Sequence, residues 1–182
     1  MNPFNNTLNT IIGNNHMAVD AAASAANKMG YQVHTIPHLI TGEVEAAARE
    51  LLQTAIHYDG PKPVCIIQGG ETTVKVTGQG KGGRNQHFVL TALYELSQQQ
   101  DQSLIDNMTI LSGGTDGTDG PTDATGAIGD KTTLVRAKHQ QLEMADYVSA
   151  HDAYHFFQLT NSLIITGPTQ TNVMDLMMAI VQ

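Results

Sequence analysis

The stretch Val64-Cys65-Ile66-Ile67-Gln68-Gly69-Gly70 decides the fold of the chain. A short apolar run that ends in two glycines predicts a strand buried on both faces of a sheet. The glycines allow a close approach of backbone or ligand, and ligands of open α/β sheets bind at such strand ends. Cys65, the single cysteine, is therefore predicted to be a buried thiol, and one cysteine excludes an internal disulfide framework.

Strand and helix patterns alternate on both sides of this stretch. Strands are predicted over residues 10–12, 31–36, 64–68, 72–77, 108–111 and 162–166. Helices are predicted from Asn14 or Asn15 to Met29, from Thr41 through the apolar stripe at 44–55, and over 85–98, 131–140, 142–149 and 153–159. Residues 173–181 fit a strand or a helix equally.

The connection between the strands at 64–68 and 72–77 is short, which favours an antiparallel hairpin. The sequence therefore predicts one layered α/β/α domain over residues 1–182, with a mixed, mostly parallel β-sheet.

The composition excludes several classes of protein. Hydrophobic residues make up 41% of the chain and charged residues 14%, as in globular proteins. A net charge of −8 argues against general binding to nucleic acid or to an anionic membrane. No apolar run approaches the roughly 18 residues of a membrane span, and the polar start lacks the pattern of a signal peptide. A cytoplasmic location is expected.

The glycine-rich loop at 78–83 contains Gly78, Gly80 and Gly83 in a Gly-x-Gly-x-x-Gly pattern. The expected hairpin before it and the missing acidic ribose position after it exclude a dinucleotide fold. A P-loop is excluded because Lys81 is followed by glycine. Free backbone N–H groups at a helix start, next to Lys81 and Arg84, predict an anion site.

The loop at 113–123 carries Asp116, Asp119 and Asp123, at spacings of three and four. Carboxylates this crowded need a nearby cation, basic group or helix N-terminus, and Mg²⁺ binds one or two carboxylates together with phosphate oxygens. Asp-Gly turns and helix caps are the alternative interpretation. Together with the polar loop at 166–172, these loops are hypothesised to converge on one edge of the sheet.

The eight histidines show no metal-binding spacing. His151 and His155 can share a helix face, but no third ligand is evident, so packing or solvent roles are predicted for them.

Five segments in this order resemble the MOFRL domain, the C-terminal domain of class II glycerate kinases, some of which carry the label hydroxypyruvate reductase. They are Gly69-Gly70-Glu71-Thr72-Thr73-Val74, Gly80-Lys81-Gly82-Gly83-Arg84-Asn85-Gln86, Gly114-Thr115-Asp116-Gly117-Thr118-Asp119-Gly120-Pro121-Thr122-Asp123, Tyr154-His155-Phe156-Phe157 and Thr166-Gly167-Pro168-Thr169-x-Thr171-Asn172. The resemblance covers roughly residues 8 to 181.

The resemblance implies phosphoryl transfer from ATP to the 2-hydroxyl of glycerate, with Mg²⁺, in a cleft between two domains. The other domain, an N-terminal Rossmann-like domain with a catalytic lysine, is not in this chain. The chain is therefore expected to be inactive unless that domain is supplied in cis or in trans.

The resemblance also implies roles for particular residues. Arg84 stabilises charge in the transition state, Lys81 and the glycine amides hold phosphate or the glycerate carboxylate, and Asp116 completes the predicted catalytic set. Asp116 and Asp119 bind Mg²⁺ or orient the attacking hydroxyl. Substrate- and phosphate-binding residues are predicted at Gly70, Glu71, Thr72, Gly82, Gly83, Asn85, Gln86, Thr115 and Asn172. Metal ligands are predicted at Asp116, Asp119 and Asp123.

Two positions depart from the family pattern. His87 stands where glutamate is usual, and His151 where asparagine is common. Two alternatives to the kinase remain: a stand-alone, non-catalytic binding module, and a hydroxypyruvate reductase, which needs NAD(P). Because a lost domain interface leaves apolar surface exposed, a homo-oligomer is predicted.

Overall fold

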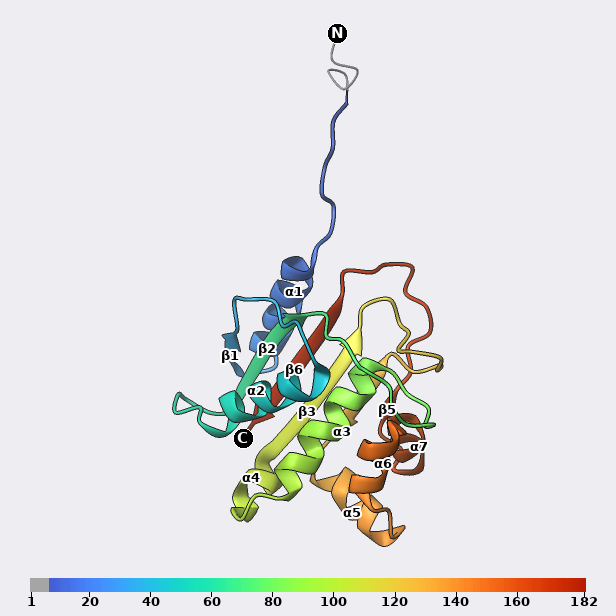
Figure 1. Ribbon diagram of the computed structural model, residues 1–182. Helices are drawn as coiled ribbons and strands as arrows, with labels where there is room; N and C mark the ends of the chain where they lie inside the picture. Colours follow the sequence, from blue (N-terminus) through green and yellow to red (C-terminus); the bar gives the residue numbers. More distant parts are fainter. Residues whose placement is uncertain (1–6) are drawn as a thin grey trace.

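A computed structural model describes residues 7–182 as helices packed on both faces of one six-stranded sheet (Figure 1). The strands are β1 (Gln32–Thr35), β2 (Val64–Gly70), β3 (Met108–Gly114), β4 (Gly126–Gly129), β5 (Leu163–Ile164) and β6 (Asp175–Val181). The helices are α1 (Asn15–Lys28), α2 (Val44–Ile56), α3 (Arg84–Ser97), α4 (Gln102–Asn107), α5 (Lys131–His139), α6 (Met144–Ala150) and α7 (Ala153–Leu159). The predicted α/β class is confirmed.

The sheet is mixed, as predicted, with the strand order β1-β2-β6-β3-β4-β5. The prediction that it is mostly parallel is wrong at the level of strand pairs: β1 and β2 pair parallel, and the other four pairs are antiparallel. The reason is β6, which returns from the end of the chain and inserts between β2 and β3. β2 and β3 run in the same direction, but β6 separates them in the sheet.

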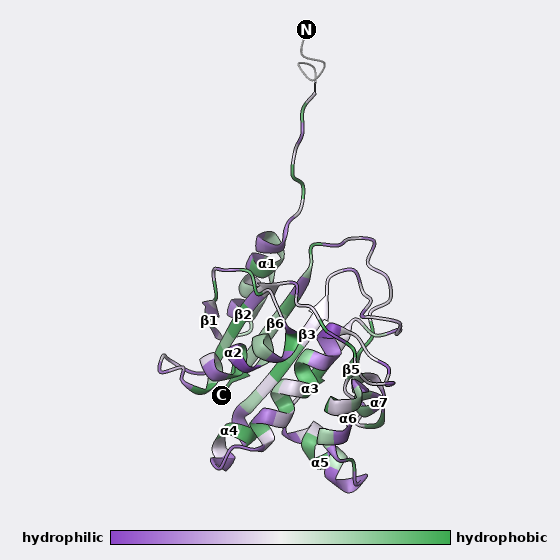
Figure 2. Cartoon of the chain, viewed as in Figure 1, coloured by the Kyte–Doolittle hydropathy of each residue, from purple (hydrophilic) through white to green (hydrophobic). Residues whose placement is uncertain are grey.

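Helices α2 and α3 cover one face of the sheet and contribute much of the main core. The predicted stripe of α2 is confirmed, because its buried residues are Val44, Ala47, Ala48, Leu51, Leu52 and Ala55. Figure 2 shows hydrophobic residues along the central strands and on the inner sides of these helices. On the same side, α6 and α7 pack against α3.

Helix α1 lies on the opposite face, against β1, β2 and β6. Asn14 is its N-cap and accepts a hydrogen bond from the Met17 amide at 2.9 Å, which satisfies one unpaired N–H of the first turn. Val19 and Ala26 pack on this face against Ile67 and Cys65. Cys65 is buried, as predicted, and burial raises the pKa of its thiol.

Several local predictions are wrong. Residues 10–12 and 72–77 form no regular strand, whereas β4 and α4 were not predicted. Segment 71–73 instead runs beside residues 40–43, with the Glu71 amide donating to Ile40 O at 3.0 Å and the Thr73 amide to Gly42 O at 2.7 Å. The backbone amides of Glu71 and Thr73 therefore bond to the loop before α2, and not to β2 as a hairpin would require. Within residues 7–182, no helix has both the length and the apolar composition to cross a membrane.

Shortening a buried leucine should destabilise the domain far more than shortening a half-exposed one. Leu93 of α3 is fully buried, and Leu93→Ala should lower the free energy of unfolding by about 2–5 kcal/mol, because it removes apolar contacts and leaves a cavity. The matched change Leu159→Ala, at a residue 47% exposed, should cost no more than about 0.5 kcal/mol. Urea unfolding of both variants measures this difference, and equal losses would contradict the described packing.

Candidate functional site

Three loops meet at one edge of the sheet, where they line an open cleft of about 810 Å³. They contain residues 71–76, 82–84 and 116–121. A fourth loop supports the third, since the Thr169 amide donates to Asp116 O at 3.0 Å. The hypothesis that the glycine-rich loops converge is therefore confirmed.

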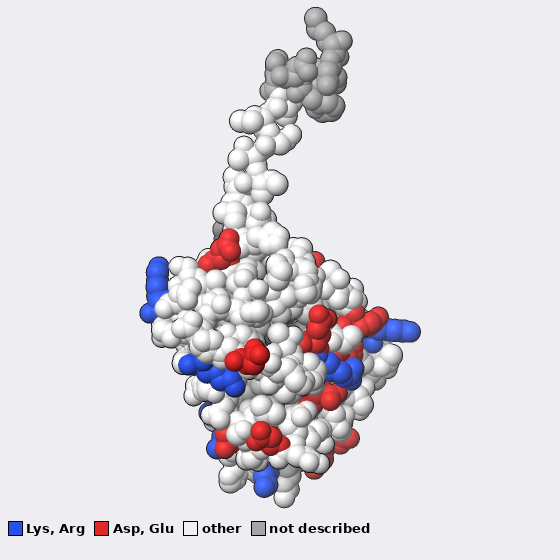
Figure 3. Space-filling view, turned by 90° about the vertical axis from the view of Figure 1, so that its left-hand side faces the viewer, with Lys and Arg blue, Asp and Glu red and all other residues white. Residues whose placement is uncertain are grey.

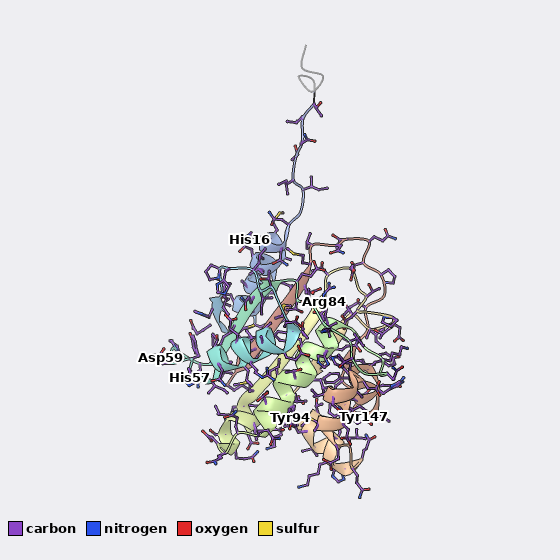
Figure 4. All side chains as sticks on the ribbon, in the orientation of Figure 1. His16, His57, Asp59, Arg84, Tyr94 and Tyr147 are labelled. Atoms are coloured by element: carbon purple, nitrogen blue, oxygen red, sulfur yellow. The ribbon has the colours of Figure 1, made fainter. Side chains whose placement is uncertain are left out.

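Arg84 is the basic side chain of this cleft and lies at the start of α3, near the ends of β6 and β3 (Figure 4). Its Nε donates to Asp175 Oδ2 at 2.9 Å, and its Nη2 lies 2.9 Å from Glu71 Oε1. Burial opposes the charge on Arg84, but Asp175 and Glu71 outweigh that effect and raise its pKa. The guanidinium is thus charged and fixed in direction.

Asp175, the partner of Arg84, is the functional residue that the sequence analysis missed. It opens β6 and stands directly between Gly70 of β2 and Gly114 of β3. A side chain at Gly114 would come within 3.3 Å of Asp175 Oδ1, so the glycine leaves room for the carboxylate. The sequence shows Asp175 only as a lone aspartate within the apolar stretch 173–181. It does not reveal that the two strands beside Asp175 end in glycines.

Asp119 caps the N-terminus of α3 from a different loop. Its Oδ1 accepts from the Asn85 amide at 3.0 Å, and its Oδ2 accepts from the Gln86 amide at 2.8 Å and from Gln86 Nε2 at 2.9 Å. The anion at the Asn85 and Gln86 amides is therefore a carboxylate of the chain itself, so these two N–H groups of the predicted anion site are not free for a ligand.

The position of Asp119 depends on Gly83. A Cβ atom at Gly83 would lie 2.2 Å from Asp119 Cγ, so a larger residue would push the carboxylate off the helix. Asp119 is only 4% exposed, and this burial raises its pKa to about 6 despite the hydrogen bonds from Gln86 and Asn85. The negative charge of Asp175 acts in the same direction as burial.

Asp116 lines the cleft and keeps part of its carboxylate accessible. Its Oδ1 accepts from the Thr118 amide at 3.0 Å, and Asn172 Nδ2 approaches its Oδ2 at 3.5 Å. Thr115 holds the loop from behind, with its hydroxyl donating to Met174 O at 2.7 Å. The predicted residues Asn172 and Thr115 thus position Asp116, and neither lines the cleft.

Residues 64–175 match the MOFRL family. The chain belongs to this family. It is 37% identical to the D-glycerate 2-kinase of Thermotoga maritima over 94% of its own length and 41% of that protein. It is 33% identical to the glycerate 2-kinase of Pyrococcus horikoshii over 97% of the chain and 40% of that protein. A crystal structure of the Thermotoga maritima glycerate kinase matches with a TM-score of 0.84 and 36% identity, over 95% of the chain and 42% of that structure.

The MOFRL chain thus spans about two-fifths of the length of the curated relatives that it matches. This coverage is what the C-terminal domain of a glycerate 2-kinase would show.

Other predicted site residues of the MOFRL chain lie away from the cleft. Lys81 Nζ stands 4.1 Å from the ring centre of Tyr154 and does not line the cleft. The side chains of Asn85 and Gln86 are buried, where they hold Asp119 and also Ser112 and Thr122. They support the site from inside the domain rather than facing a ligand.

The three predicted metal ligands do not share one site. Asp119 uses its carboxylate on α3, and Asp123 accepts from the Tyr154 hydroxyl at 2.8 Å. Among the described residues, the one group of three or more His, Cys, Asp or Glu side chains with ligand atoms within 4.8 Å of one another is Glu45, His87 and His151. The loop at 113–123 therefore offers Asp116 alone to a metal in the cleft.

The cleft carries more negative than positive charge. Its lining contains Glu71, Asp116 and Asp119 against Arg84, and Asp175 lies directly behind it. On the face shown in Figure 3, acidic side chains gather around a few basic ones in one region, while most of the remaining surface is uncharged. A phosphate ligand needs additional positive charge here.

The raised pKa of Asp119 should make the stability of the domain depend on pH. Its carboxyl group has a higher pKa in the folded than in the unfolded chain, so its contribution is fully present below the unfolded pKa of 3.8 and is lost as pH rises through the folded value of about 6. Across this window the contribution to the free energy of unfolding falls by up to about 1.4 kcal/mol per pH unit. Asp119→Asn should remove this slope, measured by urea unfolding at a series of pH values.

Asp59→Asn is the control for this measurement, because it removes an exposed aspartate outside the cleft. If Asp119→Asn and Asp59→Asn give the same pH dependence, the burial of Asp119 does not perturb its titration, and the prediction is wrong.

Proposed function

We propose that this MOFRL domain contributes half of an interdomain site in which glycerate is phosphorylated by Mg-ATP. The observation that carries the proposal is Arg84, fixed by two carboxylates at the edge of an open cleft. The names of the relatives support glycerate and ATP as substrates. Because the relatives are about 2.5 times longer, they also support a second domain as partner, in cis or in trans.

Arg84 is proposed to stabilise the phosphoryl group during transfer. Within the described residues, its Nη1 forms no hydrogen bond, while Nε and Nη2 are held by Asp175 and Glu71. A guanidinium anchored in this way can approach a phosphate without losing its direction, and no side-chain freedom is lost when the ligand arrives.

The backbone beside Arg84 completes the proposed phosphate contacts. In the described part of the chain, no hydrogen bond uses the amides of Gly82, Gly83 or Arg84, and all three residues line the cleft. Thr72 also lines it, and its buried hydroxyl has no partner within residues 7–182. These donors match the acceptor oxygens of a phosphate or of a carboxylate.

Mg²⁺ fits the cleft through Asp116. Its half-exposed carboxylate is held by Thr118 on one oxygen, and the other faces only the long contact from Asn172. Mg²⁺ in proteins takes one or two carboxylates and fills its remaining positions with phosphate oxygens and water. The ion would supply the positive charge that the acidic cleft lacks for an anionic substrate.

The alternative reductase gains no support from this site. The Gly-x-Gly-x-x-Gly loop leads into α3, whose first turn is already capped by Asp119. A pyrophosphate at that position would compete with a buried carboxylate. The non-catalytic module remains an alternative, which the following experiment distinguishes.

The proposal predicts activity by complementation. The chain alone should release no ADP from ATP, D-glycerate and Mg²⁺, because an open half-site neither positions both substrates nor excludes water. A mixture with the separately expressed remainder of the Thermotoga maritima D-glycerate 2-kinase should be active in a coupled ADP assay. Arg84→Ala should lower kcat by about 10²–10³-fold, as expected for loss of a transition-state donor.

The matched control is Arg49→Ala, which removes an arginine that is also held by a carboxylate, Glu95 at 2.8 Å, but lies away from the cleft. It should leave activity unchanged. An inactive mixture in which the two chains associate would favour the non-catalytic module.

The predicted homo-oligomer remains a proposal. Light scattering at high protein concentration should give at least twice the mass of 19.5 kDa. A strictly monomeric mass would contradict it.

A further inference from the structure

Three metal-binding side chains from distant parts of the chain meet outside the cleft. Glu45 lies in the first turn of α2, His87 in the first turns of α3, and His151 directly follows α6. Glu45 Oε1 is 3.1 Å from His87 Nε2 and 4.0 Å from His151 Nε2. One ligand atom from each residue lies within 4.8 Å of the other two.

The nitrogen atoms of this cluster are buried, and most of them lack a partner. His87 is 3% exposed, and its Nε2 contacts Glu45. Within the described residues, His87 Nδ1 and both ring nitrogens of His151 make no hydrogen bond. A buried polar group without a partner costs about 1–3 kcal/mol, so an additional ligand at His151 Nε2, the unpartnered nitrogen that faces Glu45, would be stabilising.

The two imidazoles stack with ring centres 4.7 Å apart and planes 11° apart. Burial lowers the pKa of His87, and His151 lowers it further. Glu45 opposes this effect but does not overcome it. Two imidazoles beside a carboxylate form a donor set that suits divalent first-row transition metals.

We propose that Glu45, His87 and His151 bind a divalent transition-metal ion, with Zn²⁺ as the best fit and water as the fourth ligand. Two imidazoles and one carboxylate are an established protein ligand set for zinc. With metal–ligand distances of about 2.0–2.2 Å, tetrahedral ligands stand roughly 3.3–3.6 Å apart, between the two distances of 3.1 and 4.0 Å from Glu45 Oε1 to the two Nε2 atoms. Binding requires the rings to turn so that both Nε2 lone pairs meet at one point, with the one remaining proton of each ring on Nδ1.

The ion would brace the glycine-rich loop of the cleft. His151 has the left-handed φ of 56° and stands between two residues that hold this loop. Ala150 O accepts from the Gly80 amide at 2.9 Å, and Asp152 Oδ1 accepts from the Lys81 amide at 2.8 Å. Metal bound to His151 would therefore tie the turn after α6 to the starts of α2 and α3. The site is structural and does not depend on phosphoryl transfer.

The test is a titration of the whole, chelator-treated chain with Co²⁺. We expect saturable visible absorption bands of four-coordinate cobalt at one equivalent, displaced by Zn²⁺, and a higher melting temperature with Zn²⁺ than without it. His151→Asn and Glu45→Gln should each weaken binding at least about tenfold. Asparagine suits the left-handed backbone at position 151, so this variant should fold, which its unfolding curve without metal verifies.

The matched control is His38→Asn, in an exposed histidine–carboxylate pair with Glu50 at 3.7 Å. It should bind Co²⁺ like the original chain. The proposal is overturned if Co²⁺ gives no saturable four-coordinate spectrum, or if His38→Asn weakens binding as much as His151→Asn does.

Discussion

The contact between the Asp119 carboxylate and the first turn of α3 organises the site. It joins the acidic loop to the start of the helix, and both Asp116 and Arg84 line the cleft that results. The contact is possible because Gly83 has no side chain where the carboxylate lies. The same contact satisfies helix N–H groups that would otherwise be buried without partners. One aspartate therefore fixes the geometry of two loops, at the cost of a charge held away from water.

The insertion of β6 between β2 and β3 positions the second carboxylate on which the site depends, that of Asp175. Asp175 enters the sheet between two glycines, and from there it orients Arg84. Parallel β2 and β3 deliver their loops to the same edge, but neither supplies an acidic group behind the arginine. Antiparallel β6 supplies this acidic group, because its first residue, Asp175, lies beside the last residues of β2 and β3. The topology of the sheet thus determines which residue fixes the catalytic candidate.

The sequence revealed local structure well and pairings poorly. The period of the apolar residues predicted α2 and its buried stripe, since helix geometry depends on nearby residues alone. It could not place β6 or Asp175, because an apolar run of this length suits a strand or a helix and does not reveal its neighbours. Residues 72–77 alternate like a strand, yet their partner is the loop before α2. Asp119 was predicted as a metal ligand because a carboxylate near glycines has the same sequence pattern whether it binds an ion or a helix.

The charge of the cleft agrees with the proposal that this domain supplies only half of a site. Four carboxylates lie in or directly behind it, and Arg84 is its one Lys or Arg among the described residues, so the potential of this domain alone opposes an anionic phosphate. Such an arrangement is productive only when positive charge arrives from outside, with a divalent ion or from a second domain. In the proposed half-site the acidic groups would serve two purposes: Asp175 and Glu71 hold Arg84 in place, and Asp116 would attract a cation bound to the substrate. A complete anion site would not carry this excess of negative charge. The excess is consistent with a surface that binds its substrate only after a cation or a second domain has added positive charge.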